Sequence, residues 1–167
     1  ISGPDVVAAL NHLATAQTDV PVGRALYAQL LNAHGGIEMD VTLTRVGPTD
    51  FHLTSGAAAR ARDNAYLSRH LPDSIKVTDV TEDYCTIGVM GSDSRSLLAS
   101  LGDLRDRPFG YATDALIAGV RCRATRISFV GELGWELTIA NADAPRLFDA
   151  LLRAGAKPLG HFALDEC

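Results

Sequence analysis

The chain has 167 residues, of which 47% are hydrophobic and 21% are charged, enough for one ordinary packed domain or two very small ones. Its formal net charge of −5 and its lack of lysine and arginine runs argue against nucleic acid as a main partner. No apolar run approaches the roughly 20 residues that a membrane helix needs, so no membrane partner is expected.

The cysteines and histidines predict neither a metal site nor a disulfide framework. The three cysteines, Cys85, Cys122 and Cys167, lie far apart and are odd in number, and the five histidines show no ligand spacing. A reducing compartment is the simpler interpretation, and abundant alanine and arginine with little lysine point to a bacterial cytoplasmic protein. Cys122 lies in the alternating run VRCRATRI and is expected to be a packed residue rather than a reactive thiol.

The first half of the chain is predicted to form a helix, three strands and a second helix. Apolar residues at helical spacing indicate the first helix, which a capping box from Ser2 to Asp5 would open. Alternating apolar and polar residues after a Gly-Gly turn indicate a hairpin. Alanine and arginine favour the second helix, which Pro72 ends. These elements are expected at residues 4–16, 25–31, 37–46, 51–55 and 58–71.

The second half is predicted to continue with strands, two helices and a polar loop, at residues 75–81, 84–90, 92–101 (helix), 102–113 (loop), 115–130 (hairpin), 135–140 and 141–154 (helix). Gly119 lies near the turn of the hairpin. Hairpins outnumber β-α-β units. The predicted fold class is therefore α+β, with mainly antiparallel sheets and helices packed on one face of each.

The first candidate site is the run Gly35-Gly36-Ile37-Glu38-Met39-Asp40. It places carboxylates in a strand, where Asp is disfavoured. A solvated sheet face is the commoner explanation of such a pattern. A carboxylate directed into a ligand site is the alternative, and the strand pattern alone leaves both open.

The second candidate site is the run Gly131-Glu132-Leu133-Gly134-Trp135-Glu136. Its glycines permit a tight turn or a close approach to a ligand. Glu136 lies in a predicted strand with Trp135 on the opposite face. Its two acceptor oxygens suit a ligand edge with two adjacent N–H donors, such as a pterin or a guanidinium. A solvated strand glutamate is again the simpler alternative.

Five segments in order resemble the aminomethyltransferase family of folate-binding proteins, which includes the glycine cleavage T-protein and the tetrahydrofolate domains of dimethylglycine and sarcosine dehydrogenases. They are LYAQLLNAHGGIEMDVTLTRV, SGAAARARDNAYLSRHL, IGVMGSDSRSLLASL, RISFVGELGWELTI and HFALDEC. The resemblance implies one folate-binding domain over residues 1–167. It covers about half of the family's usual length, and both ends look severed, so a domain truncated at both ends is expected.

The resemblance also implies roles for six residues, with tetrahydrofolate as the cofactor. Asp40 would be catalytic, orienting and deprotonating the folate amine or holding a cationic one-carbon unit. Glu136 would anchor the pterin through its 2-amino and N3–H donors. The other folate-binding residues would be Tyr27, Ile37, Thr42 and Phe129. Phe129 stands where the family often has Tyr, so a hydroxyl hydrogen bond is lost, at a cost of about 1 kcal/mol in affinity.

The sequence segments GVMGSDSR, GELGWEL and HFALD are most similar to those of the dimethylglycine and sarcosine dehydrogenase group. Leu164 stands where the T-protein commonly has an Arg. The implied function is capture of a methylene unit from an amine as 5,10-methylene-tetrahydrofolate. FAD would lie on a missing domain or on a flavoprotein partner. Two alternatives stay open: the glycine cleavage T-protein proper, with a lipoyl carrier protein as the aminomethyl donor, and a folate-binding regulatory module without transfer activity.

Overall fold

The computed structural model of the chain describes residues 1–104 and 107–165. The chain divides into two compact units, Ile1–Asp79 and Val80–Cys167, each with its own sheet and its own hydrophobic core. Every strand pair in both sheets is antiparallel. The predicted α+β class with antiparallel sheets is thus confirmed.

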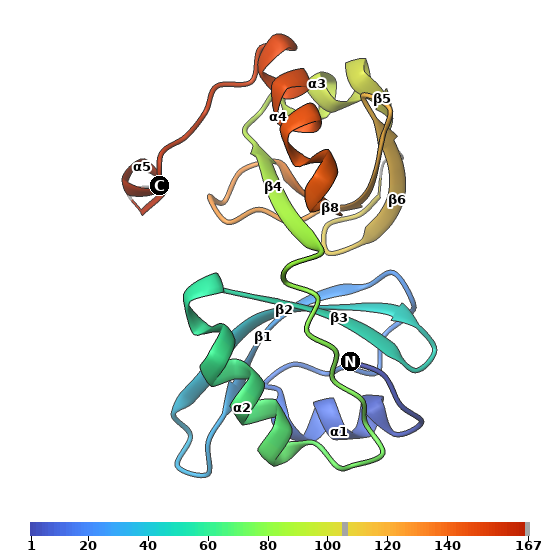
Figure 1. The fold of residues 1–167 in the computed structure, drawn as a ribbon, viewed down its shortest axis with the longest axis vertical. Helices are drawn as coiled ribbons and strands as arrows, with labels where there is room; N and C mark the ends of the chain where they lie inside the picture. The colour runs from blue at the N-terminus through green and yellow to red at the C-terminus, as the bar shows by residue number, and fades with distance from the viewer. Residues whose placement is uncertain (105–106, 166–167) are drawn as a thin grey trace. The chain divides into compact units, whose positions relative to one another are not determined.

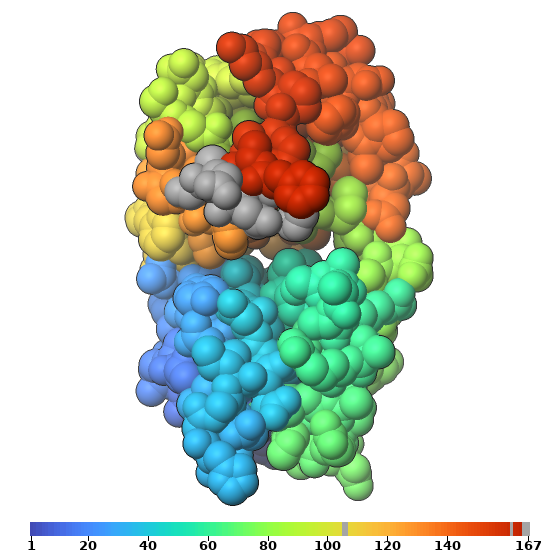
Figure 2. Space-filling view, turned by 90° about the vertical axis from the view of Figure 1, so that its left-hand side faces the viewer, coloured from blue at the N-terminus to red at the C-terminus, as the bar shows by residue number. Residues whose placement is uncertain are grey.

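The first unit is a three-stranded sheet with two helices on one of its faces (Figure 1). The strands β1 (Ala25–Leu31), β2 (Ile37–Gly47) and β3 (Asp50–Ser55) form a meander. Helix α1 (Val6–Leu13) precedes them, and the 3₁₀ turn η1 (Ala57–Ala59) leads into helix α2 (Arg60–His70). In the space-filling view, the light-blue surface of the β1–β2 hairpin lies beside the green surface of α2 (Figure 2).

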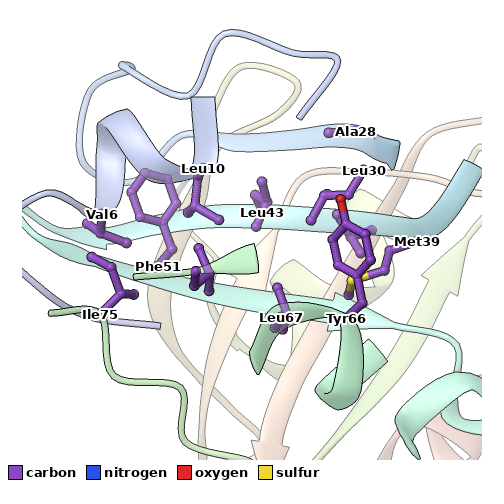
Figure 3. Packing of buried hydrophobic residues seen from close by; sticks show 12 residues of the cluster. Val6, Leu10, Ala28, Leu30, Met39, Leu43, Phe51, Tyr66, Leu67 and Ile75 are labelled. Carbon is purple, nitrogen blue, oxygen red and sulfur yellow. The ribbon is translucent and has the colours of Figure 1, made fainter. Parts of the chain in front are cut away.

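The core of the first unit forms because β2 alternates apolar and polar residues. Met39, Val41 and Leu43 are buried on one face, where side chains of both helices and of β1 cover them (Figure 3). Tyr66 of α2 closes one end of this core, and its hydroxyl donates a hydrogen bond to the carbonyl oxygen of Leu31 at 2.8 Å. The buried tyrosine thereby satisfies its polar atom while its ring packs.

The second unit has a five-stranded sheet in the order β4-β8-β7-β6-β5. The strands are β4 (Tyr84–Met90), β5 (Gly102–Asp103), β6 (Ala112–Ile117), β7 (Val120–Thr125) and β8 (Gly134–Ala140). The helices are α3 (Ser94–Leu101), α4 (Ala144–Arg153) after the 3₁₀ turn η2 (Asn141–Asp143), and the short α5 (His161–Asp165). Side chains of α3 and α4 pack on the face that carries Trp135, Leu137 and Ile139.

The turn of the β6–β7 hairpin lies where the sequence predicted it. Ala118 and Gly119 both have positive φ, 50° and 74°. Two consecutive left-handed residues are typical of a two-residue hairpin turn whose twist matches that of its strands. The prediction of a hairpin with Gly119 near its turn is confirmed, but the second strand ends at Thr125 and not at residue 130 as predicted.

Two local predictions are wrong. Residues 75–81 form no strand, because only Lys76 pairs with another backbone, at Ser2, before the chain passes from one unit to the next. The same pairing removes the predicted capping box. Ser2 exchanges hydrogen bonds with Lys76 at 2.9 and 2.7 Å, and Asp5 is an N-cap without a side-chain hydrogen bond.

Parts of two further predictions lie outside the described residues. The polar loop predicted at 102–113 is shorter than expected, because Gly102–Asp103 form β5 and β6 begins at Ala112, and it contains 105–106. The C-terminal run HFALDEC includes 166–167. Among the helices of the described ranges, none has the length and hydropathy required to cross a membrane.

Candidate functional site

The outer face of the first unit's sheet, which is the face opposite its helices, carries three of the predicted site residues. Asp40 and Thr42 alternate with the buried residues of β2, so both lie on this face. Tyr27 of β1 lies directly opposite Thr42 and is 60% exposed. The sheet therefore brings Tyr27, Asp40 and Thr42 together.

The carboxylate of Asp40 is available to a ligand. The residue is exposed, and residues 1–104 and 107–165 supply it with no hydrogen bond or ion pair. A carboxylate accepts hydrogen bonds at both oxygens. Such a group can take a proton or stabilise a nearby positive charge without first breaking an internal contact.

Ile37 lies at the beginning of β2 and is 65% exposed. It pairs with Leu31 beside an irregularity in the β1–β2 register. Alternation along β2 therefore does not assign its side chain to the outer face or to the core face. The structure places Ile37 at the end of the sheet, next to the turn that joins the two strands.

Asn32 organises that turn, a role that the sequence reasoning missed. Its Oδ1 accepts hydrogen bonds from the backbone N–H groups of His34 and Gly36, at 3.0 and 2.9 Å. Its Nδ2 donates to Glu38 at 3.0 Å. An Asn before a Gly-containing turn is a sequence signal for such bonds. The turn fixes where β2 begins, and hence the position of Asp40 along the strand.

Glu136 lies on the sheet face of the second unit that is opposite the helices. Its neighbours Trp135 and Leu137 are buried on the other face, as the strand pattern predicted. The residues opposite Glu136 are Gly88 on β4 and Thr125 on β7. Gly88 has no side chain of its own, and the terminal methyl group of Met90 lies 3.2 Å from the position that a Cβ on Gly88 would take.

Burial raises the pKa of the Glu136 carboxyl, since partial removal from water disfavours the charged form. No described residue forms a hydrogen bond or an ion pair with it. A half-buried carboxylate without a donor is costly. A ligand that brings N–H donors would remove that cost, so the arrangement suits the type of ligand edge that the sequence indicated.

Phe129 lies in the loop between β7 and β8 and is 71% exposed. The C-terminal end of this loop is closely packed at Gly134. A Cβ on Gly134 would come within 2.9 Å of Met90 and 3.2 Å of Ser128. The glycine of the second candidate run is therefore needed for packing, while Phe129 presents an apolar ring to its surroundings.

The predicted site residues thus form two sets. Tyr27, Asp40 and Thr42 share a face of the first unit, with Ile37 at the end of the same sheet. Glu136 and Phe129 belong to the second unit, one on a strand and one on a loop. Each set is fixed by its own sheet.

Within the described residues, no group of three His, Cys, Asp or Glu side chains could hold a metal ion. Cys122 is buried, and burial with nearby Asp114 raises the pKa of its thiol to about 11. The prediction that Cys122 is packed rather than reactive agrees with this environment.

Comparison with known proteins assigns the family. The model of the GCVT N-terminal domain matches residues 1–167. The chain belongs to the GCVT N-terminal domain family. It is 30% identical to an aminomethyltransferase of Listeria monocytogenes, covering 99% of this chain and 47% of that protein. It is 37% identical to a 4-methylaminobutanoate oxidase (formaldehyde-forming) of Paenarthrobacter nicotinovorans, covering 99% of this chain and 21% of that protein.

Human mitochondrial sarcosine dehydrogenase is 33% identical, over 93% of this chain and 19% of that protein. Among solved structures, the glycine cleavage aminomethyltransferase T of Bartonella henselae has the same fold, with a TM-score of 0.84 and 24% identity over 98% of this chain and 45% of that chain. The GCVT domain chain thus spans about half the length of its aminomethyltransferase relatives and about a fifth of its oxidase and dehydrogenase relatives.

Proposed function

We propose that this GCVT domain binds tetrahydrofolate and takes part in transfer of a one-carbon unit from an amine to it. The observation that carries the proposal is the family match over the whole chain, together with the carboxylates Asp40 and Glu136. Both lie on sheet faces away from the cores, and neither has a partner among the described residues. Each carboxylate, taken in its own unit, suits a ligand group that offers N–H donors.

Glu136 would hold the pterin ring. A carboxylate can accept two parallel hydrogen bonds, and the 2-amino and N3–H groups of a pterin supply two adjacent donors. The raised pKa of the half-buried Glu136 carboxyl, and the lack of a donor to it among the described residues, support this role. Phe129 would add an apolar contact without the hydroxyl hydrogen bond that a tyrosine offers.

Asp40 would serve at the reacting end. When bound, tetrahydrofolate supplies the nitrogen that attacks the one-carbon unit. The Asp40 carboxylate would accept the proton that this nitrogen loses and would stabilise the positive charge of the incoming unit. Tyr27 and Thr42, on the same face, would line the space around it, and Ile37 would contact the ligand at the end of the sheet.

The donor would be an N-methyl amine whose oxidation is carried out by a flavoprotein domain or partner with FAD. The oxidase and dehydrogenase relatives support this choice. Aminomethyltransferase relatives support the alternative, the glycine cleavage T-protein with a lipoyl carrier as donor. A cytoplasmic location would suit either enzyme.

The variant Asp40→Asn tests the proposed chemistry. In the natural polypeptide that carries these residues, it should reduce formation of methylene-tetrahydrofolate by at least a hundredfold. Binding of tetrahydrofolate should change by less than about fivefold, because Glu136 is intact. Unchanged transfer in the variant would contradict the catalytic role. A wild-type protein that binds folate but transfers nothing would support a binding module instead.

A further inference from the structure

The segment after α1 runs beside the edge strand β1 and fixes the side chain of Gln29. Thr15 donates its backbone N–H to the Gln29 carbonyl oxygen at 2.9 Å, and the backbone N–H of Gln29 donates to Thr15 Oγ1 at 3.1 Å. The hydroxyl of Thr15 in turn donates to Gln29 Oε1 at 3.1 Å. Because the Thr15 hydroxyl donates this bond, the atom of the Gln29 amide that faces Thr15 is assigned as the oxygen.

The amide nitrogen of Gln29 is therefore the end that remains to be bonded. It carries two N–H donors. Residues 1–104 and 107–165 supply no acceptor for either of them. Three hydrogen bonds between Thr15 and Gln29 thus hold an unused amide donor at the edge of the sheet.

Gln29 is the residue directly opposite Asp40 in the β1–β2 pairing. Residues paired across antiparallel strands share a face, with their Cβ atoms about 4.5–5.5 Å apart. The sheet therefore sets Gln29 and Asp40 side by side on the same outer face as Tyr27 and Thr42, with the Gln29 amide held on the Thr15 side of β1. The Gln29 amide is a donor and the Asp40 carboxylate is an acceptor. Together they suit a ligand edge that offers an acceptor to Gln29 and a nitrogen that carries a proton to Asp40.

We infer that Gln29 is a specificity-determining residue, which donates a hydrogen bond to an acceptor that lies beside the nitrogen facing Asp40. This inference rests on the proposed function. In a tetrahydropterin, the 4-oxo oxygen lies next to N5, so one edge of the ring offers an acceptor and a nitrogen side by side. Gln29 donates a hydrogen bond to the 4-oxo oxygen, Asp40 faces N5, and Thr15 holds the Gln29 side chain in place.

The test compares tetrahydrofolate with its 2,4-diamino analogue, in which an amino donor replaces the 4-oxo acceptor. Both are titrated by calorimetry into the natural polypeptide that carries this chain, as wild type and as the variants Gln29→Leu and Gln29→Glu. Gln29→Leu should weaken tetrahydrofolate about fivefold to tenfold, the loss of one hydrogen bond. Gln29→Glu replaces the donor with an acceptor. It should shift the ratio of the two dissociation constants toward the analogue by at least tenfold.

Comparing the ratio of the two dissociation constants between wild type and variants isolates the effect of Gln29. Glu136 is the same in every protein, so any effect of the analogue on binding to Glu136 cancels in this comparison. Gln17→Leu is the matched control, since Gln17 accepts a hydrogen bond from the backbone N–H of Asp19 outside the sheet. It should leave both dissociation constants unchanged. Thr15→Val keeps the amide but removes the hydroxyl that orients it, and about threefold weaker binding of tetrahydrofolate is expected.

The outcomes separate the two levels of the proposal. If wild type binds tetrahydrofolate and Gln29→Glu keeps the wild-type ratio, the role of Gln29 is overturned and the proposed function stands. If wild type binds neither compound, the proposed function fails and the role of Gln29 fails with it. If a Gln29 variant does not fold, as judged by circular dichroism, Thr15→Val decides, and unchanged binding in it contradicts the inference.

Discussion

At the scale of single residues, the candidate site depends on two carboxylates, Asp40 and Glu136, which have no hydrogen-bond or ion-pair partner among the described residues. Alternation in the strands assigned Asp40 and Glu136 to the faces opposite the buried residues, and both assignments are confirmed. The neighbours of Glu136 were not predictable, because they include Gly88, which is distant in sequence. Gln29 was missed for the same reason, since its importance comes from cross-strand register.

The raised pKa of Glu136 predicts a pH-dependent stability. The folded protein holds the carboxyl proton more tightly than the unfolded chain does, so the proton favours folding. This contribution is complete below the unfolded value of 4.5 and is lost as the pH rises through the higher folded pKa. Glu136→Gln removes the titration. The variant should therefore have a higher free energy of unfolding than wild type at pH 7, with a gap that closes below pH 4.5.

Urea unfolding of wild type and Glu136→Gln across this pH range measures that gap. The exposed Glu132 offers a matched control, because Glu132→Gln removes one carboxylate from the same segment. A gap between wild type and Glu136→Gln that stays constant with pH would show that burial does not perturb the carboxyl.

At the scale of elements, hairpins were predicted more reliably than segments whose neighbours lie far along the chain. The turns before β2 and at Gly119 carry their own glycine signals, and both form. Residues 75–81 have a strand-like pattern, but a strand also needs a continuous neighbour, and only Ser2 pairs there. The capping box failed for the same physical reason, since Ser2 is engaged by a residue more than seventy positions away.

The turn between β1 and β2 should depend on the side chain of Asn32. Asn32→Ala removes two hydrogen bonds to backbone N–H groups and one to Glu38. It should lower the free energy of unfolding by about 1–3 kcal/mol, measured by urea unfolding. His34→Ala is the control, because His34 contributes only its backbone N–H to the turn. Equal stabilities of Asn32→Ala and His34→Ala would contradict this role for Asn32.

At the scale of the whole molecule, composition allowed either one ordinary domain or two very small ones. The structure has two compact units, each with a core drawn from its own residues. The family model matches residues 1–167 as one domain. No composition shift marks the boundary after Asp79, because both units have the same sheet-and-helix construction, so the division could not be predicted.

Because each unit has its own hydrophobic core, a cavity made in one core should destabilise mainly the unit that contains it. Leu10 and Leu137 are each fully buried, one in each unit. Leu10→Ala and Leu137→Ala should each cost about 2–5 kcal/mol of stability. Residue-resolved amide exchange should accelerate first in residues 1–79 for Leu10→Ala and in residues 80–165 for Leu137→Ala. Equal acceleration in both units for either variant would argue that they open together.

The proposed function requires that Glu136 anchors a folate. The most direct measurement is a calorimetric titration of the natural polypeptide with tetrahydrofolate, beside the variant Glu136→Ala. Saturable binding by wild type, weakened at least tenfold in the variant, is the predicted result, since two hydrogen bonds to a carboxylate are lost. Equal binding by the two proteins, or no binding by wild type, would contradict it.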